Sequence, residues 1–494
     1  MIFSSVIFNW IFLPLTLGAY YFVAAQPWKK EETAQRAKNI VLLVASLVFY
    51  GLGGYKYLLI LLSVLVINYV AGIFIGKLKG SASKAVLIAA AAADIGILFV
   101  FKYLNIFVLM YENLTSGLSV GKIWNNIITL ARTGELAFTD IILPIGISFY
   151  IFQSISYVAD VRRGEVRVQK NFIDYALYVS FFPQLIAGPI VKYSDIEGQI
   201  RYRHETTEQL SEGITRFIYG ISKKVLIANV VGGMADEIWK HKIGGLGAGV
   251  TWLAAISYTL QIYYDFSGYS DMAIGLGKMF GFNIKENFNY PYISGSIREF
   301  WRRWHISLGT WFKEYVYIPL GGSRKGTGRT LLNLFIVFAL TGIWHGANFT
   351  FLIWGLFYAL LLIMEKLFLG KLLEKNPLKF LNHIYVMMSV TMAWVVFRAD
   401  NILRAGKFFS EMFRAGNGEY SVLSFLSMHG IIALIAGVIL SFPICPFLRK
   451  KIEGNKKLRS VLTPVHTVLL ILMFAYSLLV IVSGSYNPFI YYRF

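Results

Sequence analysis

The sequence predicts an all-α polytopic integral membrane protein that forms a single membrane domain over residues 1–494. Hydrophobic residues make up 56% of the chain, charged residues only 15%, and the mean hydropathy is +0.58, which is unusual for soluble domains. The apolar residues gather in runs of roughly 20, the length that a helix needs to cross a bilayer. Basic residues occupy short loops between these runs, as topology-setting loops do beside an anionic leaflet.

Taken in order, the apolar runs predict about 11–12 membrane-spanning helices. We expect them in residues 2–25, 39–54, 55–76, 84–111, 140–158, 210–239, 249–281, 330–347, 349–370, 380–397, 430–448 and 464–484. The loops 26–38 and 77–84 are rich in Lys and Arg, so the positive-inside rule places both in the cytoplasm. The N-terminus is then extracytoplasmic, and an even number of spans returns the C-terminus to the same side.

One further apolar run, residues 172–191, is interrupted by Pro183, Gly188 and Pro189. We predict a re-entrant segment here, because its broken backbone is tolerable in a membrane only if other helices cover it. A second segment, residues 298–314, is predicted to form an amphipathic helix in the cytoplasmic interface. Helical spacing would place its aromatic residues and one histidine on a single face: Trp301, Trp304, His305, Leu308 and Phe312.

The charge and cysteine content exclude several classes of function. The formal charge of +20 comes from 47 Lys+Arg against 27 Asp+Glu, but its confinement to loops indicates membrane topology rather than nucleic-acid binding. The only cysteine, Cys445, rules out a disulfide within the chain. We find no D-x-D pair, no G-x-S-x-G elbow and no histidines spaced i, i+4 for zinc, so no metal is expected.

The densest chemistry lies in residues 298–348, which we predict to be the catalytic core stretch. It contains two histidines, four tryptophans and many Arg and Lys against apolar sequence. His345 sits at the join of two apolar runs, where a titratable group is costly and therefore a functional candidate. Its flanking glycines, Gly342 and Gly346, let backbone or substrate approach the imidazole closely. A histidine with an ordinary pKa near 6.5 is suited to take a proton from a hydroxyl.

At this point the sequence resembles the membrane-bound O-acyltransferases, and within them the bacterial alginate or polysaccharide O-acetyltransferase branch. The matching blocks are FPQLIAGPI (182–190), YDFSGYSDMA (264–273), FWRRWHISL (300–308), YIPLGGS (317–323) and GIWHGA (342–347), with MIFSS (1–5) and NPFIY (487–491) at the ends. The resemblance implies a helical fold around a catalytic tunnel. It also implies that His345 is the catalytic histidine and that His305 is the second polar residue of the site.

The same resemblance implies acetyl transfer across the cytoplasmic membrane of a bacterium. Acetyl-CoA is the expected cytoplasmic donor, and Arg302, Arg303, Arg324 and Lys325 are candidates to meet its phosphates, although each also fits the positive-inside pattern. His345 would be the general base, while His305 would orient the thioester or stabilise the oxyanion. The acceptor would be an extracytoplasmic polysaccharide, reached through a partner acetyltransferase, because the chain has no recognisable soluble domain for that step.

A second group of polar and aromatic residues is expected to line the tunnel: Trp304, Trp344, Asp265, Ser267, Tyr269 and Asp271. For the two carboxylates, a structural pairing with Lys223 or Lys224 is an equally good interpretation, because buried carboxylates are expensive unless they are paired.

Two alternatives remain open from the sequence. One keeps the family but changes the cargo, to D-alanyl transfer from a carrier protein to teichoic acid. The other is a transporter for a lipid-linked glycan, in which the histidines relay protons or hold structure. Such transporters often contain two related halves, and we see no internal repeat.

Overall fold

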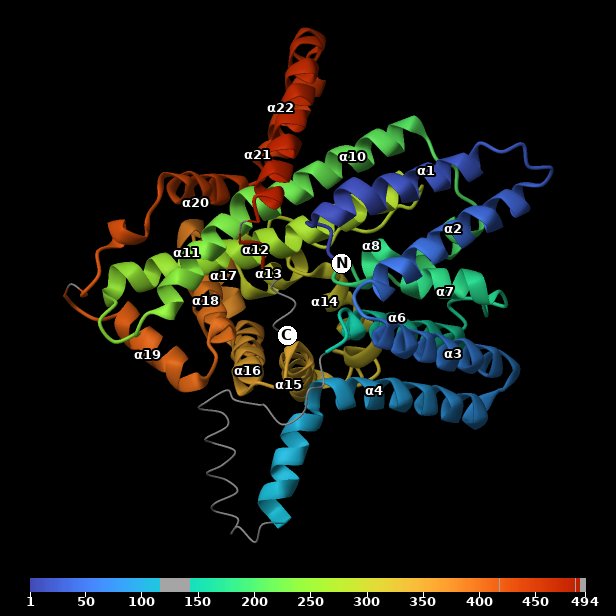
Figure 1. Cartoon of the computed structure of the whole chain (residues 1–494). Coiled ribbons are helices and arrows are strands. Elements are labelled where there is room, and N and C mark those ends of the chain that lie inside the picture. The colour runs from blue at the N-terminus through green and yellow to red at the C-terminus, as the bar shows by residue number, and fades with distance from the viewer. Residues whose placement is uncertain (116–142, 417, 485, 489–494) are drawn as a thin grey trace.

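The computed structural model describes residues 1–115, 143–416, 418–484 and 486–488, and within these ranges every regular element is helical (Figure 1). The all-α prediction is therefore confirmed. The body is built around α12 (Gly247–Met279), a helix of 33 residues whose side chains are nearly all buried. Three consecutive elements form one rod that packs along α12: α10 (Thr207–Ser222), η2 (Lys223–Ala228) and α11 (Asn229–Lys240).

The close packing of α10 on α12 depends on two pairs of facing glycines. A Cβ added to Gly220 would lie 2.5 Å from the Gly268 carbonyl oxygen, and one added to Gly268 would lie 2.7 Å from the Gly220 oxygen. Gly213 and Gly275 face each other in the same way, one pair further along both helices. Small residues at a helix interface let two backbones approach closely, which is how helices gain packing contacts without a hydrophobic driving force.

The twelve predicted apolar segments all contain helix where the structure describes them. Two of them are the α10–α11 rod and α12. The others are η1 (Phe8–Phe12) with α1 (Leu13–Ala24), α2 (Glu31–Gly51), α3 (Tyr55–Lys77), α4 (Gly80–Thr115), α6 (Ile147–Arg163), α15 (Gly326–His345), α16 (Phe349–Met364) continued by η5 (Glu365–Leu369) and α17 (Gly370–Lys375), α18 (Lys379–Arg398), α20 (Met428–Leu440) and α22 (Lys456–Val482).

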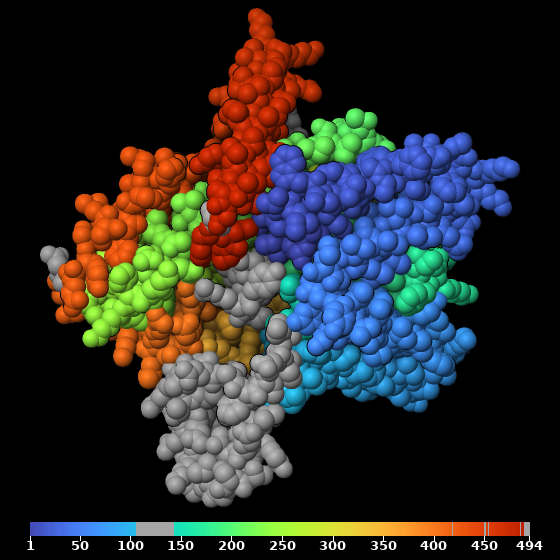
Figure 2. Space-filling view, in the orientation of Figure 1, coloured from blue at the N-terminus to red at the C-terminus, as the bar shows by residue number. Residues whose placement is uncertain are grey.

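Seven helices in the described part of the chain are long and apolar enough to cross a membrane on their own, so the protein is a multi-pass membrane protein. The helices of residues 8–24 and 428–440 are apolar but shorter, and α12 is not among the seven. The least buried of the seven, α22, projects away from the body (Figure 2). Its apolar surface suits contact with lipid.

The predicted break in residues 172–191 is confirmed. Helix α7 (Phe172–Ser180) ends before Pro183, and a short helical turn α8 (Phe182–Leu185) follows. The chain then turns at residues 186–188 and has no regular structure until α9 (Tyr193–Arg201). Residues 175–191 are buried, and neighbouring groups satisfy the broken backbone: the Phe182 N–H donates to Ser46 Oγ at 3.0 Å, and the Ile190 N–H donates to Ser307 Oγ at 3.0 Å.

The continuous amphipathic helix predicted for residues 298–314 is wrong. The structure has two short helices, α13 (Ile297–Arg303) and α14 (Ile306–Phe312), and a π-helical turn η4 (Lys313–Tyr317). The helix breaks because His305 adopts a left-handed conformation, with φ of 45°. The chain before α13 supplies the missing backbone bonds, since Asn289 N–H donates to Arg303 oxygen and Ile306 N–H donates to Asn287 oxygen, each at 2.9 Å.

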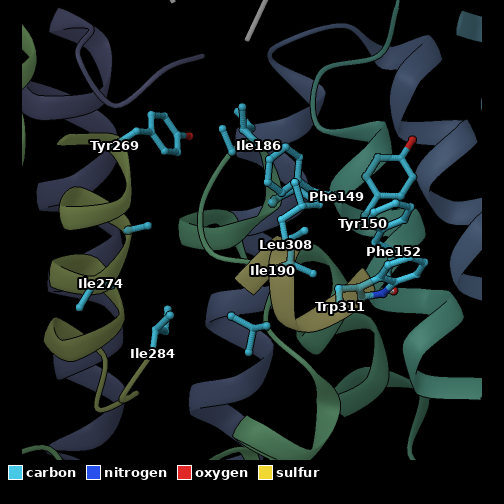
Figure 3. Packing of buried hydrophobic residues seen from close by; sticks show 14 of the residues in the cluster. Phe149, Tyr150, Phe152, Ile186, Ile190, Tyr269, Ile274, Ile284, Leu308 and Trp311 are labelled. Carbon is cyan, nitrogen blue, oxygen red and sulfur yellow. Dashed lines mark hydrogen bonds between the residues drawn. The ribbon is translucent and has the colours of Figure 1, made fainter. Parts of the chain in front are cut away.

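Aromatic packing seats α14 against α6 (Figure 3). The rings of Phe152 and Trp311 stack with centroids 3.7 Å apart, and Trp311 Nε1 donates to the Phe152 carbonyl oxygen at 3.0 Å. This contact fixes the segment that carries His305 relative to the start of α6. The remaining elements are η3 (Pro291–Ile293), α19 (Ile402–Met412), η6 (Val422–Phe425) and α21 (Ile444–Glu453).

Candidate active site

His345 is the last residue of α15 and is enclosed by aromatic rings. Its ring centroid lies 4.8 Å from Trp344, 5.0 Å from Trp354 of α16 and 5.1 Å from Phe397 of α18. The residue is only 8% exposed. Three helices therefore hold one imidazole in a largely apolar setting at the point where α15 ends.

A close contact between α15 and α16 fixes the position of that helix end. A Cβ added to Gly342 would lie 2.4 Å from the Phe351 carbonyl oxygen, and one added to Gly355 would lie 2.2 Å from the Phe338 oxygen. The close neighbour of Gly342 is therefore the backbone of α16. Because these glycines allow α16 to pack directly on α15, the imidazole one turn further on has a defined place.

A small cavity of about 50 Å³ lies beside His345. The residues that line it come from α4, the end of α15, Ile186 and the segment that leads into α6: Lys102, Leu143, Pro144, Ile145, Gly146, Ile147, Ser148, Phe149, Ile186, Trp344 and His345. Apart from His345, Lys102 is the only ionisable side chain that the described residues contribute to this lining. The cavity thus presents one titratable imidazole and one cation to anything that enters it.

His305 also lies close to Trp344. Its ring is 6.3 Å from the Trp344 ring, 4.6 Å from Phe266 and 6.4 Å from Phe149, measured between centroids. The residue is 2% exposed. The two histidines, which are 40 positions apart in the sequence, therefore both contact one tryptophan, and the structure brings together the pair that the sequence singled out.

The hydrogen bonds of His305 identify which of its ring nitrogens carries the proton. The Ser307 backbone N–H, which can only donate, lies 3.1 Å from Asn287 Oδ1. The Asn287 amide must therefore turn its oxygen, and not its NH2 group, toward Ser307. Asn287 Nδ2 accordingly points the other way and donates to Ser270 Oγ at 3.2 Å. His305 Nδ1 is 3.2 Å from the same Oδ1, so Nδ1 is the donor.

With its proton on Nδ1, a neutral His305 presents Nε2 as a hydrogen-bond acceptor. Burial lowers the pKa of His305 to about 3, which keeps the ring neutral near pH 7. Nε2 is buried and has no hydrogen-bond partner among the described residues. A neutral acceptor of this kind receives a proton or a hydrogen bond from a substrate or a water, and it does not donate to an oxyanion.

The two carboxylates on α12 that we expected in a tunnel are ion-paired. Lys224 Nζ lies 2.5 Å from Asp265 Oδ1, and both side chains are almost fully buried. Asp271 is bound by Lys223 and Arg216, each at 2.6 Å. The structural pairing, one of the two interpretations open from the sequence, is what the structure contains.

The other expected tunnel residues divide into two groups. Trp344 lines the cavity, whereas Trp304 packs on Trp394 with centroids 4.9 Å apart and does not reach the cavity. Ser267 and Tyr269 are buried on α12, where Tyr269 stacks on Phe3 at 4.5 Å, and neither lines the cavity.

The four candidate phosphate-binding cations lie at the surface. Arg302, Arg324 and Lys325 are exposed, and Arg303 is half-buried and paired with Glu299 at 2.9 Å. None of the four lines the cavity beside His345.

Sequence reasoning missed two residues of this site. Lys102 was counted within the apolar segment 84–111, although a lysine inside such a segment is itself a signal. Asn287 lies in a polar loop where no pattern singles it out, and its role depends on a contact across 18 residues that only the fold creates.

Comparison with known proteins adds a family and its relatives. Residues 87–405 match the model of the membrane-bound O-acyltransferase family. The chain is 39% identical to a probable alginate O-acetylase of Pseudomonas putida over the full length of both chains. It is 34% identical to a peptidoglycan O-acetyltransferase of Helicobacter pylori, covering 82% of this chain and 79% of the relative. A teichoic acid D-alanyltransferase of Bacillus subtilis is 28% identical over 45% of this chain and 59% of its own length.

Proposed function

The chain belongs to the membrane-bound O-acyltransferase family, which makes it a membrane-embedded acyltransferase, and on that premise we propose that it is a polysaccharide O-acetyltransferase. The proposed donor is cytoplasmic acetyl-CoA. The acetyl group crosses a bacterial cytoplasmic membrane and reaches an extracytoplasmic polysaccharide such as alginate through a partner acetyltransferase, with both termini of this chain on the extracytoplasmic side.

The observation that carries the proposal is the position of His345, at a helix end and beside a cavity. In the reaction, its imidazole takes the proton of the acceptor hydroxyl as that oxygen attacks the acetyl carbonyl carbon. The carbonyl electron pair moves to oxygen, and the tetrahedral intermediate then collapses with cleavage of the carbon–sulfur bond. The leaving thiolate takes the proton back from the imidazolium, so the base is regenerated.

His305 is assigned a positioning role that differs from oxyanion stabilisation. Its Nε2 is an acceptor, so it can receive a hydrogen bond from the acceptor hydroxyl or from the second ring nitrogen of a protonated His345. Either contact would orient the reacting groups beside the Trp344 ring. The hydrogen bond from Nδ1 to Asn287 keeps the ring in this state.

The relatives indicate which acyl group is transferred. Full-length identity of 39% to a probable alginate O-acetylase favours acetyl transfer, while the likeness to a D-alanyltransferase covers under half of this chain. Similarity to a peptidoglycan O-acetyltransferase supports an extracytoplasmic glycan as the final acceptor.

The test is the content of base-labile O-acetyl groups in the secreted polysaccharide of a deletion strain carrying wild type, His345→Ala or His305→Ala. Loss of a general base typically costs about 10²–10⁴-fold, so acetyl should be nearly absent with His345→Ala and reduced with His305→Ala. His429→Ala, at an exposed position at the start of α20, is the matched control and should leave acetyl content unchanged. Normal acetyl content with His345→Ala, at equal protein level, would overturn its role as the base.

A further inference from the structure

Lys102 of α4 occupies a position that the reaction outlined above does not use. Its side chain lines the same cavity as His345, and its Nζ donates to the carbonyl oxygen of Trp344, the residue before His345. Its ammonium also lies 5.6 Å from the centroid of the Trp344 ring. The lysine is thus held directly beside the candidate base.

Part of this arrangement is helix capping. The last carbonyls of a helix lack intrahelical donors, and the neighbouring Tyr103 hydroxyl likewise donates to the Ile343 carbonyl oxygen. A hydroxyl is sufficient for that purpose, as Tyr103 shows. Helix capping therefore does not explain why the residue that lines the cavity, Lys102, is a lysine.

Lys102 has no partner of opposite charge among the described residues. It makes no ion pair with a described Asp or Glu, and its ammonium has three N–H donors, of which one is used by Trp344. A cation beside an apolar membrane cavity is costly without a partner of opposite charge. A negative charge that develops inside the cavity would supply that partner.

We infer that Lys102 is the oxyanion donor of this site, an inference that rests on the proposed acetyl transfer. As the acceptor oxygen attacks the thioester carbonyl, the negative charge that forms on the carbonyl oxygen is stabilised by the Lys102 ammonium. When the intermediate collapses, that charge passes to the departing sulfur, and the ammonium keeps its protons throughout. His305 cannot supply this donor, because Asn287 leaves its Nε2 as an acceptor.

Three variants distinguish the effect of the Lys102 charge from the effect of helix capping. Lys102→Gln keeps an N–H donor that can reach the Trp344 carbonyl but removes the charge, and Lys102→Arg keeps the charge. Tyr103→Phe removes the neighbouring cap alone. Each is measured in membrane vesicles of the host as transfer of radiolabel from acetyl-CoA into base-labile esters, giving kcat and KM, together with thermal unfolding of the purified protein.

We expect kcat of Lys102→Gln to fall about 10²-fold, as when an oxyanion donor is removed, with KM and the melting temperature near those of wild type. Lys102→Arg should keep most of the activity, and Tyr103→Phe should lower the melting temperature more than kcat. Unchanged kcat in Lys102→Gln would overturn the inference, and so would an equal loss of kcat in Tyr103→Phe. If wild type transfers no label from acetyl-CoA, the proposed function itself fails, which is a separate outcome.

Discussion

The helix α12 and the end of α15 both bury polar side chains, but in different surroundings. On α12, Asp265 and Asp271 each meet a cation of the α10–α11 rod at 2.5–2.6 Å. Around α15, the two histidines are surrounded by aromatic rings, a cavity opens beside His345, and His305 Nε2 lacks a partner among the described residues. In sequence both regions look alike, as polar residues inside apolar runs.

The difference shows how to separate structural from chemical polar groups in a membrane protein. A buried charge in contact with an opposite charge is already paired, so its removal lowers the stability of the fold. His345 instead lines a cavity, where a substrate can reach its imidazole, and His305 Nε2 has no hydrogen-bond partner among the described residues. Removal of either histidine is therefore expected to change the reaction more than the fold.

The largest effect on the fold is expected from breaking the α12 pair. Lys224→Met leaves the Asp265 carboxylate buried without its ion-pair partner, and breaking such a pair typically costs about 3–5 kcal/mol. The free energy of unfolding in mixed micelles measures this loss. Specific acetyl transfer by the fraction that stays folded should remain close to wild type.

The double variant Lys224→Met with Asp265→Leu supplies the control. Replacing both members of a buried pair by apolar groups is often close to neutral, so stability should largely return. A double variant that is stable but inactive would place Asp265 in the reaction and would abolish the distinction between the two regions.

A smaller effect, and one on the reaction, is expected at Asn287. Asn287→Leu removes the acceptor that orients His305 through Nδ1, and one such hydrogen bond, worth about 0.5–1.5 kcal/mol in the transition state, corresponds to a fall in kcat of about 2–13-fold. Asn287→Asp keeps an acceptor oxygen in place and should retain more activity. Acetyl transfer from radiolabelled acetyl-CoA gives both values.

A tautomer measurement tells positioning from simple destabilisation. In ¹⁵N NMR of histidine-labelled protein, His305, assigned by comparison with His305→Ala, should carry its proton on Nδ1 in wild type and Asn287→Asp. In Asn287→Leu the proton should redistribute toward Nε2. A proton on Nε2 in wild type would contradict the hydrogen-bond assignment and would return His305 to consideration as an oxyanion donor.

The contrast also explains what could be predicted from the sequence. Runs of apolar residues were sufficient to place the helices, because their length and hydropathy are local properties. The break at His305 could not be predicted, since the pattern from Trp301 to Phe312 fits a helix and the alternative is stabilised by contacts distant in sequence, among them the hydrogen bonds with residues 287–289. In the same way, the sequence left two roles open for Asp265, an ion pair with a lysine or a place in the tunnel. The packing of α10 on α12, which the sequence does not reveal, decides for the ion pair.

The smallest effect is expected from surface cations, which form a third case because their charge is exposed to water. Arg324 and Lys325 are exposed in the turn before α15, where water and salt screen their charges. If they meet the phosphates of acetyl-CoA, each contact is worth about 1 kcal/mol or less, so the double variant Arg324→Gln with Lys325→Gln should raise KM for acetyl-CoA by several-fold at most. kcat and stability should not change, and the effect on KM should shrink as salt is added. A fall in kcat that persists at high salt would show that this turn takes part in the reaction. An exposed residue could then not be assumed to lie outside the reacting site.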